Sequence, residues 1–408
     1  DSLKANTTAS GNVAVGREAG MANTTGCGIV AVGTGAGMTN TTSNDITALG
    51  YVALKDNTGA YNTAVGAYSL TENTTGANNT AIGFRSLCAN TTGIRNTASG
   101  YSTLRSNTTG CHNSAHGHHA MGSNTTGCYN TASGYEALYS NTTATGNTAH
   151  GWKALHANTT AGANAAFGIA ALFTNTTGAY NTATGDRALC GNTTGAYNTA
   201  SGACALFTNT TGGYNTAVGR SALFSNTTAS NNVAVGYEAL KANTTGPMNV
   251  GIGYQALLKN TTADGNIAIG YLAQCASTTG GANIALGSEA LFRNTTGHSN
   301  VAINKDSMQC NTSGCYNTAV GLKTLVLNIA NNFGTAVGAY ALCSSRADFN
   351  TAVGYDAMRC TGTGGSNAAL GFQALRVNTT GSSNTASGYK ALVANTTASY
   401  NTAYGGLA

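Results

Sequence analysis

A 17-residue repeat runs through all 408 residues and limits the possible folds more than any other feature of the sequence. Numbered from the Asn of its Asn-Thr-Thr triplet, the unit reads N-T-T-G-x-Y-N-T-A-V-G-Y-x-A-L-x-x, as in residues 209–225. The Gly at position 11 marks 24 copies, and only Asn304 replaces it. Two copies, at 57–59 and around 345–350, are one residue short. These deletions must lie in turns, because a deletion within a strand would turn every later side chain to the opposite face.

The columns of the repeat predict a stacked β-structure. Position 9 is Ala in 23 copies, with Gly251 as the exception, so no larger side chain is tolerated there. Position 10 is usually Val, Ile or Leu and position 15 is usually Leu, which gives two separate apolar ladders. Positions 7 to 10 favour a short strand, whereas Y-x-A-L fits either a second strand or one helical turn. One copy is too small to bury a core, so identical neighbours must stack on it.

The predicted fold class is therefore all-β: a parallel β-solenoid of about 24 coils of 17 residues. We expect residues 1–408 to form a single continuous repeat domain, either trimeric or stacked end to end. The first and last copies look like the interior ones and carry no polar cap, which favours self-association as a homo-oligomer or an end-to-end polymer.

Composition excludes several functional classes. Only 8% of the residues are charged, against about 25% in ordinary globular domains, and no apolar run is long enough for a membrane-spanning helix. The 18 Lys and Arg residues occupy no consistent column, so they form no basic stripe for nucleic acid. A surface repeated 24 times lacks the unique group of side chains that catalysis requires. We expect no enzyme activity, no cofactor and no membrane insertion.

Positions 7 to 11 resemble a known family. Residues 12–16, 232–236 and 266–270 read N-V-A-V-G or N-I-A-I-G, which is similar to the S-V-A-I-G core of YadA-type trimeric autotransporter heads. The resemblance implies a parallel β-roll in which three chains associate, and a role as a surface adhesin. The family repeat is shorter, and this chain has no heptad stalk. The longer unit also resembles repeat tracts in tail-fibre-like proteins of phages and algal viruses, so both resemblances imply an extracellular, cell-surface or virion-surface location.

The Asn at position 1 carries the clearest functional signal. It is present in 21 copies, and in 19 of them Thr or Ser follows two residues later, which is the acceptor pattern for N-glycosylation. Because so few charges protect the surface, a hydrated coat would keep the chain soluble. We expect covalent glycans to project from this column. The predicted sites are Asn6, Asn23, Asn40, Asn73, Asn90, Asn107, Asn124, Asn141, Asn158, Asn175, Asn192, Asn209, Asn226, Asn243, Asn260, Asn294, Asn311, Asn378 and Asn395.

The alternative is a ladder in which stacked Asn amides hydrogen-bond along the solenoid. Position 7 is also Asn in 21 copies, but Ala at position 9 prevents an acceptor pattern, so this second column fits a ladder. At Ser277 the position-1 Asn is lost while Thr278 and Thr279 remain. The triplet therefore does not vary as a unit, which counts against glycosylation.

The 11 Cys residues are scattered, so disulfides are not the framework of the fold. Cys111 and Cys128 occupy position 5 of adjacent copies and form the best candidate disulfide. Cys310 with Cys315 and Cys343 with Cys360 are weaker candidates. Four of the seven His residues lie in residues 111–119, which begin with Cys111. This cluster is either local variation of the repeat or a zinc site. In that alternative the ligands are His112, His118 and His119 rather than His116; no metal site is the preferred interpretation.

Three functions remain open. The favoured one is a structural subunit of an extracellular fibre or filament, N-glycosylated along position 1. The second is the shaft of a surface adhesin or viral tail fibre that binds receptors. The third is an ice-binding solenoid, which needs Thr-x-Thr on one strand, whereas the Thr residues at positions 2 and 3 are adjacent and point to opposite sides. Aromatic columns at positions 6 and 12 either stack on their own kind, which we favour, or bind carbohydrate.

Overall fold

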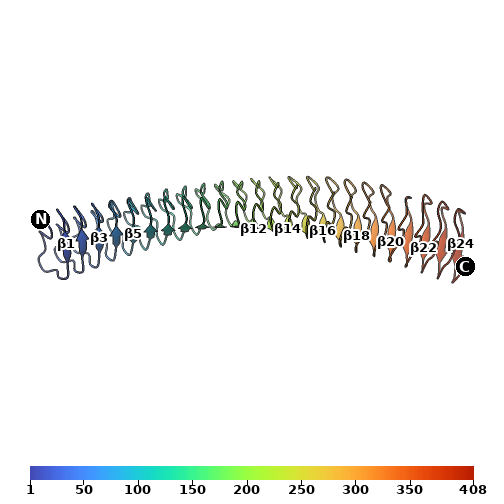
Figure 1. Ribbon diagram of the computed structural model, residues 1–408, viewed down its shortest axis with the longest axis horizontal. Coiled ribbons are helices and arrows are strands. Elements are labelled where there is room, and N and C mark those ends of the chain that lie inside the picture. Colours follow the sequence, from blue (N-terminus) through green and yellow to red (C-terminus); the bar gives the residue numbers. More distant parts are fainter. The chain divides into compact units, whose positions relative to one another are not determined.

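The fold was analysed in a computed structural model that describes all 408 residues. The chain forms two compact units, Asp1–Ala203 and Cys204–Ala408, which are built from the same coil and are described separately. Each coil contributes one three-residue strand, at positions 8 to 10, followed by turns (Figure 1). The predicted all-β parallel β-solenoid of 24 coils is confirmed. The structure contains no helix, and hence none suited to crossing a membrane.

Twelve strands belong to each unit. The strands of the first unit are β1 (Val13–Val15), β2 (Val30–Val32), β3 (Thr47–Leu49), β4 (Thr63–Val65), β5 (Thr80–Ile82), β6 (Thr97–Ser99), β7 (Ser114–His116), β8 (Thr131–Ser133), β9 (Thr148–His150), β10 (Ala165–Phe167), β11 (Thr182–Thr184) and β12 (Thr199–Ser201). Those of the second unit are β13 (Thr216–Val218), β14 (Val233–Val235), β15 (Val250–Ile252), β16 (Ile267–Ile269), β17 (Ile284–Leu286), β18 (Val301–Ile303), β19 (Thr318–Val320), β20 (Thr335–Val337), β21 (Thr351–Val353), β22 (Ala368–Leu370), β23 (Thr385–Ser387) and β24 (Thr402–Tyr404).

Within each unit, neighbouring strands pair in parallel and in register, so that every repeat position lies above its own equivalent. The two short coils keep this register. Thr47 of β3 faces Thr63 of β4, and Thr335 of β20 faces Thr351 of β21, although only 16 residues separate each pair. The missing residues lie between the strands, which confirms that both deletions fall in turns.

The Y-x-A-L segment is neither a second strand nor a helical turn, so both expected alternatives are wrong. It is a run of turns in which the left-handed φ recurs at positions 13 and 15, as at Ser221 (56°) and Leu223 (51°). The N–H of Leu223 donates to the carbonyl of Ala239 in the next coil at 3.0 Å. The backbone N–H groups of this segment thus bond to carbonyls of the next coil. The segment therefore does not have to form a helix or a second strand to satisfy them.

Position 11 requires Gly for two reasons. At Gly117 the φ is 121°, outside the region that L-residues normally adopt. A Cβ at Gly117 would also lie 2.6 Å from the carbonyl oxygen of Gly134 in the next coil. Asn304, the one replacement, has a φ of 98°. Asn is among the side chains that tolerate positive φ best.

The two apolar ladders lie in different environments. Ala132, Ala137 and Leu138, at positions 9, 14 and 15 of one coil, have no exposed surface and represent the core columns. Successive side chains of a strand point to opposite faces, so position 9 points inward and positions 8 and 10 point outward. Position 10 is accordingly exposed, as at Val218 (39%) and Ile269 (40%), or half-buried, as at Val235 and Ile252. The tight space around position 9 therefore lies inside a single coil.

Candidate functional site

The position-1 Asn side chains lie inside the solenoid. Of the 19 predicted glycosylation sites, 17 have no exposed surface. Asn6, in the first coil, is exposed, and Asn395 is half-buried. The expectation that this column projects outward is therefore wrong.

Asn107 shows how the column is held. Its Nδ2 donates to Oδ1 of Asn90 in the preceding coil at 2.8 Å and to the carbonyl of Gly110 in its own coil at 3.0 Å. Its Oδ1 accepts from Nδ2 of Asn124 in the following coil at 2.7 Å. Each amide of this kind links two neighbours, and the column forms runs of hydrogen bonds within the core that are interrupted where the repeat departs from its pattern.

The position-7 Asn side chains form a second ladder beside the first. The Oδ1 of Asn96 accepts the backbone N–H of Asn113 at 3.0 Å, and its Nδ2 donates to the carbonyl of Gly110 at 2.8 Å. Both ladders therefore converge on the carbonyl at position 4, which points into the core and has no strand partner. The interior amides satisfy a buried backbone group that would otherwise destabilise the coil.

A glycan on Nδ2 of a buried position-1 Asn would occupy the space of the neighbouring coil and remove both hydrogen bonds that Nδ2 donates. The predicted glycan sheath is therefore incompatible with the folded solenoid, and the Asn ladder explains the column. The Thr at position 2 also links adjacent coils, since Oγ1 of Thr108 donates to the carbonyl of Thr125 at 3.1 Å. The hydroxyl at position 3, which completes the acceptor pattern, makes no hydrogen bond within the solenoid; Thr109 is exposed.

Unpaired polar atoms in the first ladder lie beside departures from the repeat. The Oδ1 of Asn40 has no partner where the next coil is the short one beginning at Asn57. The Oδ1 of Asn260 has none because Ser277, in the next coil, has no amide to offer. At the end of the copy that begins with Asn260, Gln274 replaces the usual Leu of position 15, and its Nε2 donates to Oδ1 of Asn266 at 3.0 Å and to Oγ of Ser277 at 3.3 Å. Gln274 was not among the residues predicted from the sequence.

The outward strand face combines exposure with an absence of charge. None of the 24 strands carries Asp, Glu, Lys or Arg at position 8 or position 10. Between these two columns in β21 to β24 runs a shallow groove of about 330 Å³, lined mainly by apolar atoms of residues that include Val353, Leu370 and Tyr404. The packing of a single chain does not explain the composition of this face.

The face changes character along the chain. In β14 to β18 both columns are entirely aliphatic, and all ten side chains are exposed or half-buried. We call these residues the aliphatic section: Val233, Val235, Val250, Ile252, Ile267, Ile269, Ile284, Leu286, Val301 and Ile303. In β6 to β9, by contrast, the two columns carry only Thr, Ser and His. An ice-binding face would need Thr-x-Thr in the strands. Among the 24 strands this pattern occurs in β11 alone, at Thr182 and Thr184.

The aromatic columns stack on their own kind, as favoured. Tyr237, Tyr254 and Tyr271 at position 12 have successive ring centroids 5.3 and 5.5 Å apart and nearly parallel planes. At position 6, Tyr180 and Tyr197 stack at 5.0 Å. Neighbouring rings therefore cover the flat faces that a sugar would contact, and the ring edges remain exposed.

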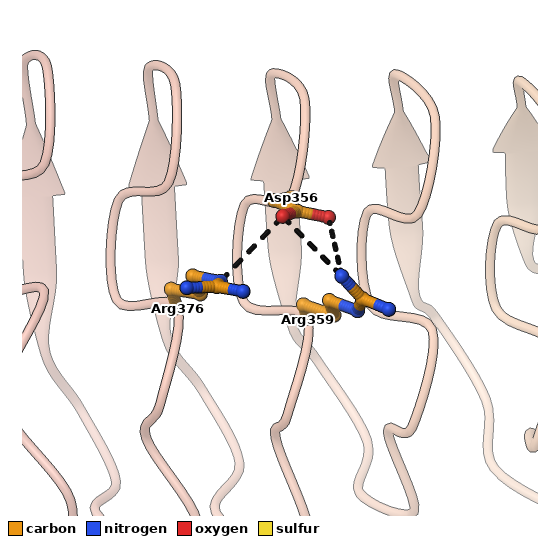
Figure 2. Close-up of polar contacts among 3 residues, drawn as sticks. All are labelled: Asp356, Arg359 and Arg376. Atoms are coloured by element: carbon orange, nitrogen blue, oxygen red, sulfur yellow. Dashed lines mark hydrogen bonds and ion pairs between the residues drawn. The ribbon is translucent and has the colours of Figure 1, made fainter.

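Charged side chains gather at positions 13 and 16. Asp356 is only 2% exposed and lies between Arg359 of its own coil, at 3.4 Å, and Arg376 of the next coil, at 3.5 Å (Figure 2). Glu238 is held similarly by Nζ of Lys241 at 2.6 Å and by Nε2 of Gln255 at 2.8 Å. The hydrogen bond from Lys241 is the main reason that the pKa of Glu238 is lowered. These groups link adjacent coils and are not arranged around a substrate pocket.

The His-rich segment is divided among several columns. His112 stacks on Tyr129 at 4.9 Å, whereas His118 lies between Tyr101 and Tyr135. His119 meets His118 edge to face, with centroids 4.4 Å apart. No group of three or more His, Cys, Asp or Glu side chains is placed to hold a metal ion, so the three zinc ligands considered are not brought together.

The cysteine pair Cys111 and Cys128 is brought together. Their Sγ atoms lie 2.7 Å apart, and both cysteines are free thiols in this structure. Neither Cys310 with Cys315 nor Cys343 with Cys360 makes a comparable sulfur contact. Burial, followed by the hydrogen bond with Cys128, raises the pKa of Cys111 to about 11.

The sequence matches no protein-family model, and no curated protein matches it. A functional proposal therefore has to rest on the coil and its surfaces.

Proposed function

We propose that the chain is a structural subunit of an extracellular fibre or filament that associates with further copies through its outward strand face. The observation that carries this proposal is the charge-free, exposed strand face, above all its aliphatic section. Because the Asn ladders are buried, the proposal no longer includes a glycan coat. The fibre would instead be built by stacking of coils and by association of chains.

Parallel sheets are normally covered on both faces, and strands buried on both faces are apolar throughout. The strands of the aliphatic section have this composition, as in Ile267–Ile269 (I-A-I), yet the coil covers only one of their faces. Ile267 and Ile269 remain 37% and 40% exposed. An apolar surface of this kind is typical of an interaction site.

The partner that fits this face is a second copy. Its columns repeat at the strand spacing of about 4.8 Å, and sheets pack face to face about 10 Å apart. A second solenoid has the same repeat, so the side chains of one face can lie between those of the other over five successive coils. The partner cannot present charges, because none on this face would pair with them.

The test is the oligomeric state of the full chain, measured by sedimentation over a range of concentrations. Ile269→Lys places a charge in the centre of the aliphatic section on a side chain that is already exposed. Thr184→Lys, at the same repeat position in β11, is the matched control. We expect wild type and the control to associate and Ile269→Lys to remain monomeric. A monomeric wild type, or association unaffected by Ile269→Lys, would overturn the proposal.

The alternative proposal is the shaft of a surface adhesin or viral tail fibre. The N-x-A-V-G and N-x-A-I-G segments support it, since they resemble repeats of both classes. Receptor binding by the chain itself would separate this alternative from a purely structural fibre. Binding of labelled protein to intact cells, unchanged by Ile269→Lys, would favour the adhesin.

A further inference from the structure

Where repeat position 5 carries a polar side chain or a cysteine, that side chain can accept a hydrogen bond from the position-5 N–H of the coil before it. The N–H of Cys27 donates to Oδ1 of Asn44 at 2.9 Å, and the N–H of Ser382 donates to Oγ of Ser399 at 2.9 Å. The column thus fixes the direction of each side chain along the solenoid axis, toward its neighbour in the preceding coil.

In one place both members of this column are cysteines. The N–H of Cys111 donates to Sγ of Cys128 at 3.0 Å, and this bond holds the Cys128 sulfur against the Cys111 sulfur. The resulting distance between the two Sγ atoms, 2.7 Å, is well inside the contact distance of two unbonded sulfurs. The pairing therefore follows from the architecture of the column. Both residues are half-buried, so a small oxidant can reach them.

We propose that Cys111 and Cys128 are an oxidation site that forms a reversible disulfide between adjacent coils. The oxidant is a low-molecular-weight disulfide such as oxidised glutathione. One cysteine thiolate attacks a sulfur of that disulfide, and the first small thiol leaves. The second cysteine thiolate then attacks the protein-bound sulfur and releases the second thiol. The two cysteines lose two protons and two electrons in all, and the two released thiols carry them.

The thiolate is the reactive form of cysteine, and burial, followed by the hydrogen bond with Cys128, raises the pKa of Cys111 to about 11, so Cys111 is a poor nucleophile near neutral pH. Closing the bond ties the coil of β7 to the coil of β8 without moving either strand, because the column already holds the sulfurs together.

The sequence provides a direct assay. Trypsin cleaves after Arg105 and Lys153, and the peptide 106–153 contains Cys111 and Cys128 as its only cysteines. The peptide 18–55 contains only Cys27, which occupies the same column and is exposed. The native full chain is treated with oxidised glutathione, its free thiols are alkylated, and both peptides are then weighed after digestion.

We expect peptide 106–153 to lose two hydrogens and escape alkylation, and a dithiol reductant to reverse both effects. In Cys128→Ser, whose hydroxyl can still accept the N–H of Cys111, Cys111 should be alkylated or carry glutathione. The control Cys315→Ser should leave the crosslink intact. Full alkylation of Cys111 and Cys128 under conditions in which Cys27 takes up glutathione would overturn the proposal, as would a crosslink that forms only in the unfolded chain.

Discussion

The strongest test of the buried Asn ladder compares two substitutions in one Asn-Thr-Thr triplet. Asn107→Ala and Thr109→Ala both destroy the same N-glycosylation acceptor pattern. Only the first removes a buried side chain, since Asn107 has no exposed surface and Thr109 is exposed. A glycan role predicts the same result for both variants, whereas the ladder predicts different results.

The magnitude follows from the contacts of Asn107. Its loss leaves Oδ1 of Asn90 without a donor, and an unsatisfied buried acceptor costs about 1–3 kcal/mol. The carbonyl of Gly110 and Nδ2 of Asn124 each lose one hydrogen bond and keep another, which adds about 1 kcal/mol for each bond lost. We expect the free energy of local opening to fall by at least about 3 kcal/mol, the low end of this sum, in Asn107→Ala and by less than about 0.5 kcal/mol in Thr109→Ala.

Amide hydrogen exchange is the suitable assay, because a stack of repeats can open locally without unfolding as a whole. A loss of about 3 kcal/mol corresponds to exchange roughly a hundredfold faster in the coils of β6 to β8. Exchange in distant coils, such as those of β20 to β22, serves as the internal control. Equal effects of the two variants, or none in Asn107→Ala, would refute the ladder as the reason for this column.

Two further predictions concern contacts between coils. Restoring the repeat pattern with Gln274→Leu and Ser277→Asn together should raise the free energy of local opening by about 2 kcal/mol, because the new amide supplies the donor that Oδ1 of Asn260 lacks. Ser277→Asn alone should gain less, since Gln274 occupies the space beside it. A double variant no more stable than wild type in hydrogen exchange would contradict this account. Because the pKa of Glu238 is lowered in the folded state, its ion pair stabilises the coil fully above the carboxyl's unfolded pKa of about 4.3 and is lost as the pH falls through the lower folded value. On acidification, the loss of this ion pair should therefore lower the free energy of unfolding of the wild type by no more than about 1 kcal/mol. Glu238→Gln should abolish that part of the pH dependence, measured by urea unfolding.

Much of the fold is predictable from the columns alone. Period-two alternation predicts the strand at positions 8 to 10 and the inward-facing Ala at position 9. The fixed register of a stacked sheet predicts that the deletions fall in turns. The turn segment was less predictable. The left-handed φ of Leu223 runs against the ordinary preference of Leu, and the hydrogen bond to Ala239 in the next coil, together with complete burial of the side chain, stabilises that conformation.

The main error was to predict that the position-1 Asn side chains point outward. The sequence pattern is ambiguous here, because a glycosylation acceptor and a hydrogen-bonded ladder both require Asn. One signal in the sequence pointed inward. Gln274 stands three residues before Ser277, where the position-1 Asn is lost, and its amide reaches both Ser277 and the second ladder. Compensation of this kind is expected only between neighbours in a core. At position 7, Ile29 and Ile46 replace Asn and are fully buried, which fits the ladder expected for that column.

Unlike an ordinary globular domain, the solenoid has rows of polar Asn side chains in its interior, beside Ala and Leu. The narrow width of the coil is the reason. A coil of 17 residues turns its position-4 carbonyl, such as that of Gly110, toward the interior, so amides must be placed inside to satisfy it. Ala and one Leu per coil fill the remaining space, which leaves Val and Ile of the strand outside. The interior polar ladder follows from the narrow coil, whereas the aliphatic section does not, because the same coil carries only Thr, Ser and His on this face in β6 to β9. This difference between coils of equal width supports the proposal that the aliphatic section is an association surface.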